Sequence, residues 1–315
     1  MSKVNELRGR AAVADAKALP LKKSKPRIAL LGLGRMGRAF AVQLCRGDLA
    51  IKGWTRSNRA YENVRGLEVT SDASDAVRNA DIVVTILADS AAVSAVLFDS
   101  HLVDLIRPGA IVIDMGTTGP HAAREHGDLL ARHQIDYLDA PVSGGERAAE
   151  RGQLTIFVGG DPIVFQRARP FLERLGRPRL LGPIGTGQTA KLANQIIVAV
   201  SIAAVAEALR FAERYGLHAA ELIDALQGGF ADSTILRQHG IRMAHRDFTA
   251  GGACRLHLKD LRLIKDMMGG DIASLRHTSA SFEGFEKLVA TGFSEADHSA
   301  YFELYEDVLP QDPPT

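Results

Sequence analysis

The stretch RIALLGLGRMG, residues 27–37, decides the fold of this chain. An apolar run typical of a strand ends at Gly32, and a helical pattern follows Gly37. At this spacing the first glycine permits a tight turn, the second lets the backbone approach a pyrophosphate, and the third lets the helix pack closely on the strand. The stretch therefore predicts a dinucleotide-binding βαβ unit. Its candidate cofactor residues are Gly32, Leu33, Gly34, Arg35, Met36 and Gly37.

Apolar runs with strand character recur after this unit and alternate with helix-like segments. Such alternation predicts a parallel sheet covered by helices. The further predicted strands are LAIKGW (49–54), DIVVTIL (81–87), AIVIDM (110–115), DYLDAPV (136–142), LTIFVG (154–159) and PRLLG (178–182).

Beyond residue 187 the pattern becomes helical. Residues 188–215 predict one long buried helix that Gly216 ends, with one apolar face formed by Ile197, Val200, Ala204, Ala208 and Phe211. We expect an α/β Rossmann-type domain followed by an all-α domain joined through this helix. The predicted boundaries are an N-terminal extension (1–26), the Rossmann domain (27–187), a helical substrate and oligomerisation domain (188–308) and a tail (309–315).

The charge balance excludes partners that need a strong field. The chain has 38 basic and 37 acidic residues, which predicts no affinity for nucleic acid or for an anionic membrane surface. The apolar stretch 192–212 is interrupted by polar residues, so we interpret it as a helix of a soluble protein. Cys45 and Cys254 lack the spacing of a metal site, and no metal is predicted.

Residues 1–26 are rich in lysine, arginine and alanine, and Pro20 and Pro26 interrupt them. Glu6 and Asp15 argue against a transit peptide, and no signal peptide is visible. We interpret the segment as a peripheral extension and expect a cytoplasmic protein.

The end of the second predicted strand bears on the choice of cofactor. It reads WTRSNR (54–59), where an acidic residue would hold the ribose of NAD. Arg56 and Arg59 can instead pair with a 2′-phosphate. Thr55, Arg56 and Ser57 are therefore candidate cofactor residues, and we predict a preference for NADP(H), with NAD(H) as the alternative.

Three later segments carry side chains suited to chemistry: DAPVSGG (139–145), GTGQTAKLAN (185–194) and LHLKDL (256–261). In the first, Ser143 and the backbone N–H groups of Gly144 and Gly145 can capture a carboxylate. In the second, Lys191 and Asn194 are spaced to share one face of the long helix.

Together with the glycine-rich turn, these segments resemble the signature motifs of the β-hydroxyacid dehydrogenase family over residues 27–308. That family includes 3-hydroxyisobutyrate dehydrogenase, tartronate semialdehyde reductase and 6-phosphogluconate dehydrogenase. KLANQIIVA (191–199), Gly228-Gly229, Ser233-Thr234 and DHSA (297–300) look closest to the tartronate semialdehyde reductase type.

The resemblance implies reduction of a small semialdehyde acid, with Lys191 as general acid and base and Asn194 beside it. It assigns the substrate carboxylate to Ser143, Gly144 and Gly145, and it implies a homodimer or homotetramer. The further cofactor contacts that it implies are Leu87, Ala88, Thr117 and Lys259.

Two departures from the family pattern concern the site. Residues 248–252 read FTAGG where the family often has Phe-x-Pro-Gly-Phe, and Ala88 replaces a proline.

Two alternative functions stay open. An NADPH-dependent imine reductase shares the architecture but generally lacks the lysine, and a non-catalytic NADP-binding scaffold would be expected to have lost it.

Overall fold

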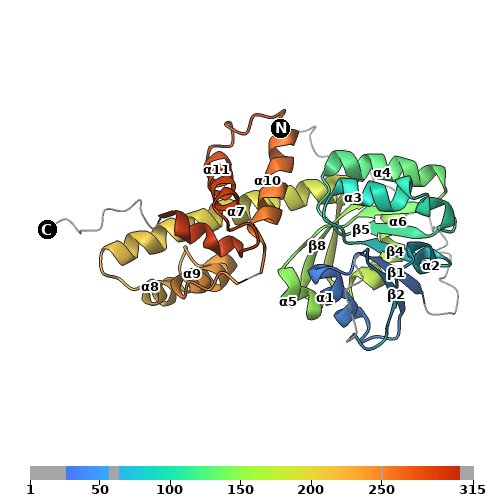
Figure 1. Ribbon diagram of the computed structural model, residues 1–315, viewed down its shortest axis with the longest axis horizontal. Helices are drawn as coiled ribbons and strands as arrows, with labels where there is room; N and C mark the ends of the chain where they lie inside the picture. The colour runs from blue at the N-terminus through green and yellow to red at the C-terminus, as the bar shows by residue number, and fades with distance from the viewer. Residues whose placement is uncertain (1–25, 57–63, 250, 306–315) are drawn as a thin grey trace, which may run out of the picture.

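The computed structural model describes residues 26–56, 64–249 and 251–305. They form a sheet domain and a helical domain, and α7 (Thr186–Arg214) runs from one into the other (Figure 1). The predicted fold class is confirmed. Ser57 and Arg59, both predicted to face the cofactor, lie outside the described residues, as do residues 1–25 and 306–315.

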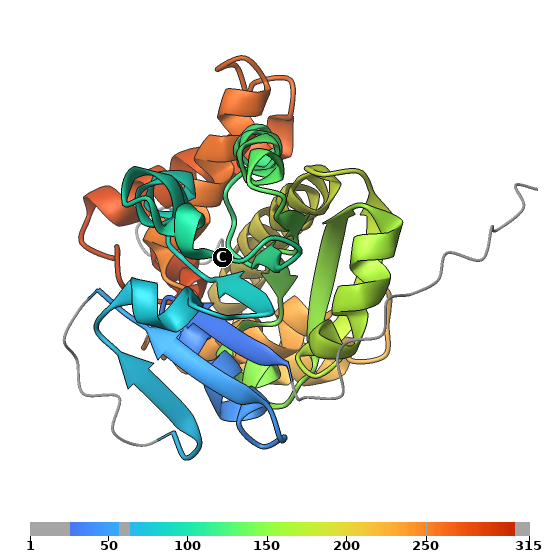
Figure 2. The ribbon, with the colours of Figure 1, turned by 90° about the vertical axis from the view of Figure 1, so that its right-hand side faces the viewer.

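Among the described residues, the sheet has nine strands in the order β3-β2-β1-β4-β5-β6-β8-β7, and β9 also pairs with β8. Figure 2 looks onto this domain, with the helical domain behind it. The strands are β1 (Arg27–Leu31), β2 (Ala50–Trp54), β3 (Leu67–Thr70), β4 (Ile82–Thr85), β5 (Ile111–Asp114), β6 (Asp136–Asp139), β7 (Val142–Ser143), β8 (Leu154–Gly160) and β9 (Gly176–Gly182).

Alternate residues of the central strands enter two separate cores. In β1, Ile28 and Leu30 face one core, while Ala29 and Leu31 face the other. This period of two follows from strand geometry. Residues of α1 and α6 complete the first core, and residues of α2 and α4 complete the second.

The helices and helical turns of the sheet domain are α1 (Arg35–Leu44), α2 (Ala73–Val77), α3 (Ser90–Ser94), η1 (Ala95–Asp99), η2 (Leu102–Leu105), α4 (Pro120–Arg132), α5 (Gly145–Glu150) and α6 (Pro162–Leu172). All seven runs predicted to be strands contain one, but the run 136–142 is divided between β6 and β7. The predicted parallel arrangement is found from β3 to β6, whereas β8 runs antiparallel to β6 and β7. Strand β3 was missed because its sequence, LEVT, has no buried apolar run.

The helical domain packs around α7. Leu192, Ala199, Ile202, Ala206 and Leu209 of this helix enter a core shared with the other helices. Those other elements are α8 (Ala219–Leu226), η3 (Leu236–Gly240), α9 (Ile241–Ala244), α10 (Cys254–Met267), α11 (Arg276–Ala290) and η4 (His298–Tyr305).

Helix α7 ends as predicted, because Gly216 takes a φ of 81° directly after the cap. The expected buried face is wrong: Ile197 is 67% and Phe211 61% exposed. The helix carries apolar residues around most of its circumference, so periodicity alone did not show which face packs within the chain. Among the described helices α7 is also long and apolar enough to cross a membrane, but its other face packs into the core of the helical domain.

Candidate active site

The amino end of α7 is fastened to the sheet domain by two buried side chains. Asp139, at the end of β6, accepts hydrogen bonds from the backbone N–H groups of Gly185 and Gln188, both at 2.8 Å. A carboxylate there caps the helix and faces the positive end of its dipole. The Gln188 amide accepts from Thr118 N at 3.0 Å and donates to Gly116 O at 2.9 Å. Lys191, three residues beyond Gln188, is thereby placed where the two domains meet.

The glycine-rich turn has the geometry expected of a phosphate-binding loop. Gly32 has a φ of 108°, and its N–H donates to Trp54 O at 2.9 Å. A Cβ on Gly37 would lie 1.8 Å from Gly32 O, so only glycine allows this approach of helix to strand. A Cβ on Gly34 would meet nothing within 4 Å, which leaves open space beside the amino end of α1. The turn therefore fits a dinucleotide.

The other residues of the turn have structural partners. Leu33 is buried and Met36 packs against the first core. Arg35 forms an ion pair with Glu146 at 2.5 Å. Thr55 and the exposed Arg56 directly follow β2. Since Gly32 N donates to Trp54 O at the end of β2, both residues lie near the glycine-rich turn.

Lys259 connects the helical domain to the predicted cofactor loops. From α10 its Nζ donates to Thr117 O at 2.6 Å and to Ala88 O at 3.1 Å, and it pairs with Asp260 Oδ1 at 3.1 Å. Leu87 lies in the same loop and packs against the second core. Residues predicted from three separate segments, Leu87-Ala88, Thr117 and Lys259, thus come together.

Lys191 is buried beneath this junction. Burial lowers the pKa of its ammonium group, the charge of Lys259 lowers it further, and Asp260 opposes the shift. A lysine in such a place can reach its neutral form at a pH where an exposed lysine cannot. It is therefore suited to both giving and taking a proton.

The partner of Lys191 is Gln195, which the sequence did not single out. Lys191 Nζ donates to Gln195 Oε1 at 2.9 Å, and Asn194 Nδ2 donates to the same oxygen at 3.0 Å. Asn194, which was expected beside the lysine, is thus linked to it through this shared acceptor. The signal available was Gln195's position four residues after Lys191, which places it on the same helix face.

The SGG segment, residues 143–145, joins β7 to α5. Ser143 ends β7, and the glycines after it take positive φ angles, 131° at Gly144 and 70° at Gly145. Among the described residues, none of these three forms a hydrogen bond with Lys191 or Gln195. Strand β7 pairs with β8, while the amino end of α7 is held by Asp139 at the end of β6.

Sequence reasoning also missed a buried carboxylate, that of Asp114 at the end of β5. It is fully buried and accepts from Thr85 Oγ1 at 2.8 Å, Thr118 Oγ1 at 2.9 Å and Gly116 N at 3.2 Å. Burial raises its pKa to about 6, against the lowering effect of these hydrogen bonds. Asp114 shapes the loop that carries Thr117. The available signal was an acid ending an apolar strand.

Three histidines continue inward from Gln195. His257 Nδ1 lies 3.5 Å from Gln195 Nε2, and His298 Nε2 lies 3.2 Å from His239 Nε2. His239 and His298, with Asp297, have ligand-type atoms within 4.8 Å of one another. The Asp297 carboxylate already accepts hydrogen bonds from Gly252 N at 2.8 Å and Ser299 Oγ at 2.7 Å. Its role is therefore structural: it fixes Gly252, which lies in the segment that departs from the family pattern.

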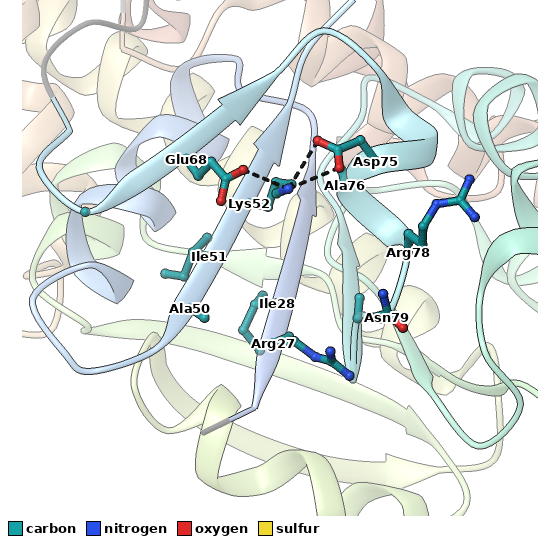
Figure 3. Close-up of a pocket in the computed structure, with 12 residues that line it drawn as sticks. Arg27, Ile28, Ala50, Ile51, Lys52, Glu68, Asp75, Ala76, Arg78 and Asn79 are labelled. Atoms are coloured by element: carbon teal, nitrogen blue, oxygen red, sulfur yellow. Dashed lines mark hydrogen bonds and ion pairs between the residues drawn. The ribbon is translucent and has the colours of Figure 1, made fainter. Parts of the chain in front are cut away.

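A cavity of about 430 Å³ lies elsewhere, at the amino ends of β1 and β2 (Figure 3). Lys52 points into it and is neutralised by Glu68 at 2.7 Å and Asp75 at 3.1 Å. Ligands of open α/β sheets bind at the carboxyl ends of the strands. The cavity therefore lies at the opposite end of the strands from the candidate site.

Two family models match the chain. The NAD-binding domain of 6-phosphogluconate dehydrogenase matches residues 27–187, and the NAD-binding domain of NADP-dependent 3-hydroxyisobutyrate dehydrogenase matches residues 185–305. The 2-hydroxy-3-oxopropionate reductase of Escherichia coli (strain K12) is 38% identical over 283 residues, which cover 89% of this chain and 97% of that protein.

Two further similarities are weaker in sequence and equally broad in coverage. The NAD-dependent L-serine dehydrogenase of Pseudomonas aeruginosa is 31% identical and covers 89% of this chain and 97% of its own length. A solved structure of Mycobacterium tuberculosis 3-hydroxyisobutyrate dehydrogenase with L-serine has a TM-score of 0.78 at 30% identity, covering 90% of this chain and 100% of that one.

Proposed function

Because the chain belongs to the β-hydroxyacid dehydrogenase family of NAD(P)-dependent oxidoreductases, which act on CH–OH groups, we propose that it reduces a small semialdehyde acid to its 3-hydroxy acid. Tartronate semialdehyde and glycerate are the leading pair, in line with the name of the Escherichia coli relative. The observation that carries the proposal is the buried Lys191, whose lowered pKa suits it to proton transfer at the domain junction.

The cofactor would be held by the glycine-rich turn and the loops that follow β4 and β5. Gly32, Gly34 and the first turn of α1 would take the phosphates. When bound, the nicotinamide supplies or accepts the hydride. Lys259 already links the loops of Ala88 and Thr117 to the helical domain and would help to keep them in place.

The chain's own part in the reaction is proton transfer and positioning. During reduction the Lys191 ammonium donates its proton to the substrate's carbonyl oxygen, and during oxidation the neutral amine takes the hydroxyl proton. Ser143 and the N–H groups of Gly144 and Gly145 would bind the substrate carboxylate, and Asn194 the substrate hydroxyl. Fixing the substrate at two points orients the reacting carbon.

We propose NADP(H) as the preferred cofactor, with NAD(H) as the alternative. The supporting observations are the exposed Arg56 directly after β2 and the lack of an acidic residue at positions 54–59. Measurement of kcat/KM with NADPH and NADH, for the natural chain and for Arg56→Ala, tests this. A higher value with NADH in the natural chain would overturn the preference.

A substrate panel tests the function itself. NADPH consumption would be followed with tartronate semialdehyde, methylmalonate semialdehyde and a cyclic imine. Turnover of either semialdehyde is the expected result, and its rank order assigns the substrate. Turnover of the imine alone would favour an imine reductase, and NADPH binding without any turnover would favour a non-catalytic scaffold.

The exposed apolar face of α7 supports assembly with a second copy of the chain. A groove of about 600 Å³ lies along α7 and α8, lined by residues that include Ala204, Ala208, Phe211, Leu222 and Leu226. The two alanines leave room for another helix to approach closely. We propose a homodimer, alone or within a homotetramer, formed through this face.

A further inference from the structure

The side chain of Gln195 lies between a buried cation and a buried anion. Its Oε1 accepts from Lys191 Nζ at 2.9 Å, and its Nε2 donates to Asp260 Oδ2 at 2.7 Å. The charges on either side determine which way the amide points, since only the oxygen can face an ammonium and only the NH₂ a carboxylate. Among the described residues, no ion pair joins Lys191 directly to Asp260.

We propose that Gln195 is an electrostatic spacer, a positioning residue that holds Lys191 by a hydrogen bond and keeps it from pairing directly with Asp260. A buried lysine paired directly with a carboxylate would retain its proton, because the attraction between opposite charges is strong where water is excluded. A neutral amide provides an acceptor without a full negative charge. The inference deepens the proposed function, on which it rests.

The proton balance of the reaction is compatible with this role. In oxidation the substrate's hydroxyl proton moves to the Lys191 amine, and in reduction the ammonium returns one proton to the carbonyl oxygen. Gln195 neither gains nor loses a proton. Its Oε1 can accept an N–H of Lys191 in both states, so the lysine keeps its place while its charge changes.

Asp260 is compensated from its other side. Its Oδ1 pairs with Lys259 at 3.1 Å, while its Oδ2 takes the Gln195 N–H. The carboxylate therefore has a cationic partner of its own and does not need the proton of Lys191. Burial and the charge of Lys259 therefore lower the pKa of Lys191. Asp260, which the Gln195 amide separates from the lysine, acts in the opposite direction.

The other titratable groups around this arrangement add little charge. His257 of α10 faces Gln195, and burial, with Lys191 and His239, lowers its pKa to about 3. Burial also holds the pKa of His298 well below its usual value. Both rings are therefore neutral near pH 7. On the sheet side, Asp139 is engaged by the amino end of α7. Asp260 is thus the acid from which Lys191 must be separated.

The experiment compares two substitutions of Gln195 that should raise the pKa of Lys191 for different reasons. Gln195→Glu places a carboxylate where the amide oxygen lies and should raise that pKa by at least about one unit. Gln195→Met keeps the volume but removes the hydrogen bond that holds Lys191, so the ammonium can turn toward Asp260 and its pKa should rise. Gln238→Glu, the same chemical change at an exposed position of η3, is the matched control and should leave it unchanged.

The readout is competitive labelling of Lys191 with acetic anhydride, followed by peptide mass spectrometry across a pH series. It reports the titration of the lysine without any turnover. The pH dependence of kcat for oxidation should shift upward in parallel for Gln195→Glu. Circular dichroism confirms that each variant is folded.

Unchanged labelling in folded Gln195→Glu would overturn the proposal, since it would show that a charge at this position does not act on Lys191. An unchanged or lower pKa of Lys191 in folded Gln195→Met would also overturn it, because the lysine would then be kept from Asp260 without the amide. This arm remains decisive if Gln195→Glu does not fold. If the labelling shifts as expected but Lys191→Ala keeps full turnover, the spacer stands and the proposed function fails.

Discussion

Lys259 Nζ donates a 2.6 Å hydrogen bond to the backbone carbonyl oxygen of Thr117. The donor lies on α10 of the helical domain, and the acceptor lies in the loop after β5 of the sheet domain. Besides the continuous chain of α7, this contact holds the two domains in register around the predicted cofactor loops. A hydrogen bond from a charged donor to a carbonyl oxygen is stronger than one between two neutral groups.

Lys259→Met should therefore loosen the site without unfolding the protein. We expect a rise in the KM for NADPH and a fall in kcat/KM of about 10-fold to 100-fold, because small errors of placement are costly to catalysis. Steady-state kinetics and a thermal melt measure both effects. Lys287→Met, an exposed lysine of α11, is the control and should alter neither.

Lys191→Ala should lower turnover by about 10²-fold to 10⁴-fold while NADPH still binds. The measurements are kcat in both directions and NADPH binding by fluorescence. Near-normal turnover would refute the assigned role.

The pH dependence of the natural chain should have opposite signs in the two directions. Oxidation requires the neutral amine, so its rate should rise as the pH increases through the pKa of Lys191. Reduction requires the ammonium, so its rate should fall over the same interval. Because burial lowers this pKa, both transitions should lie below 10.5, the usual lysine value. Transitions at or above that value would contradict the burial argument.

Two glycines of the same turn should respond differently to alanine. Gly37→Ala places a methyl group 1.8 Å from Gly32 O and should destabilise the sheet domain as well as abolish cofactor binding. Gly34→Ala meets no protein atom within 4 Å, so the protein should fold normally and lose affinity for NADPH alone. Thermal melts and NADPH titration separate these outcomes. Equal loss of stability in both variants would argue against the assignment of Gly34 to the phosphates.

Asp114→Asn should change how stability depends on pH. Because the pKa of Asp114 is raised from 3.8 to about 6 in the folded protein, the folded state binds more protons between these values. The natural chain should thus lose stability, relative to the variant, as the pH rises through about 6, by up to about 3 kcal/mol. Urea unfolding at several pH values measures this. A difference that grows in the opposite direction would show that the carboxylate is stabilised when charged.

Phe211→Asp should disrupt the proposed dimer while leaving the fold of one chain intact, since this ring is 61% exposed in the single chain. Sedimentation velocity should show a shift toward monomer. Ile163→Asp, a similarly exposed apolar position on α6, is the control. If the natural chain is itself monomeric, the proposed face is not an interface between copies.

The features that could be predicted from the sequence are local. Strand runs, the glycine spacing of residues 32–37 and the helix ended by Gly216 depend on turn chemistry and on periodicity within a few residues. The alternation of strands and helices then predicted the fold class. The order of the motifs, with Lys191 among them, also indicated the family.

Tertiary structure decided which of these residues touch. Helical spacing makes both Asn194 and Gln195 neighbours of Lys191, and only the packing of α10, which brings Asp260 against the amide, selects Gln195. The reversed β8 and the exposed stripe of α7 likewise depend on what packs against them. Contacts between residues far apart in the chain depend on how whole elements pack, and local patterns carry no record of that packing.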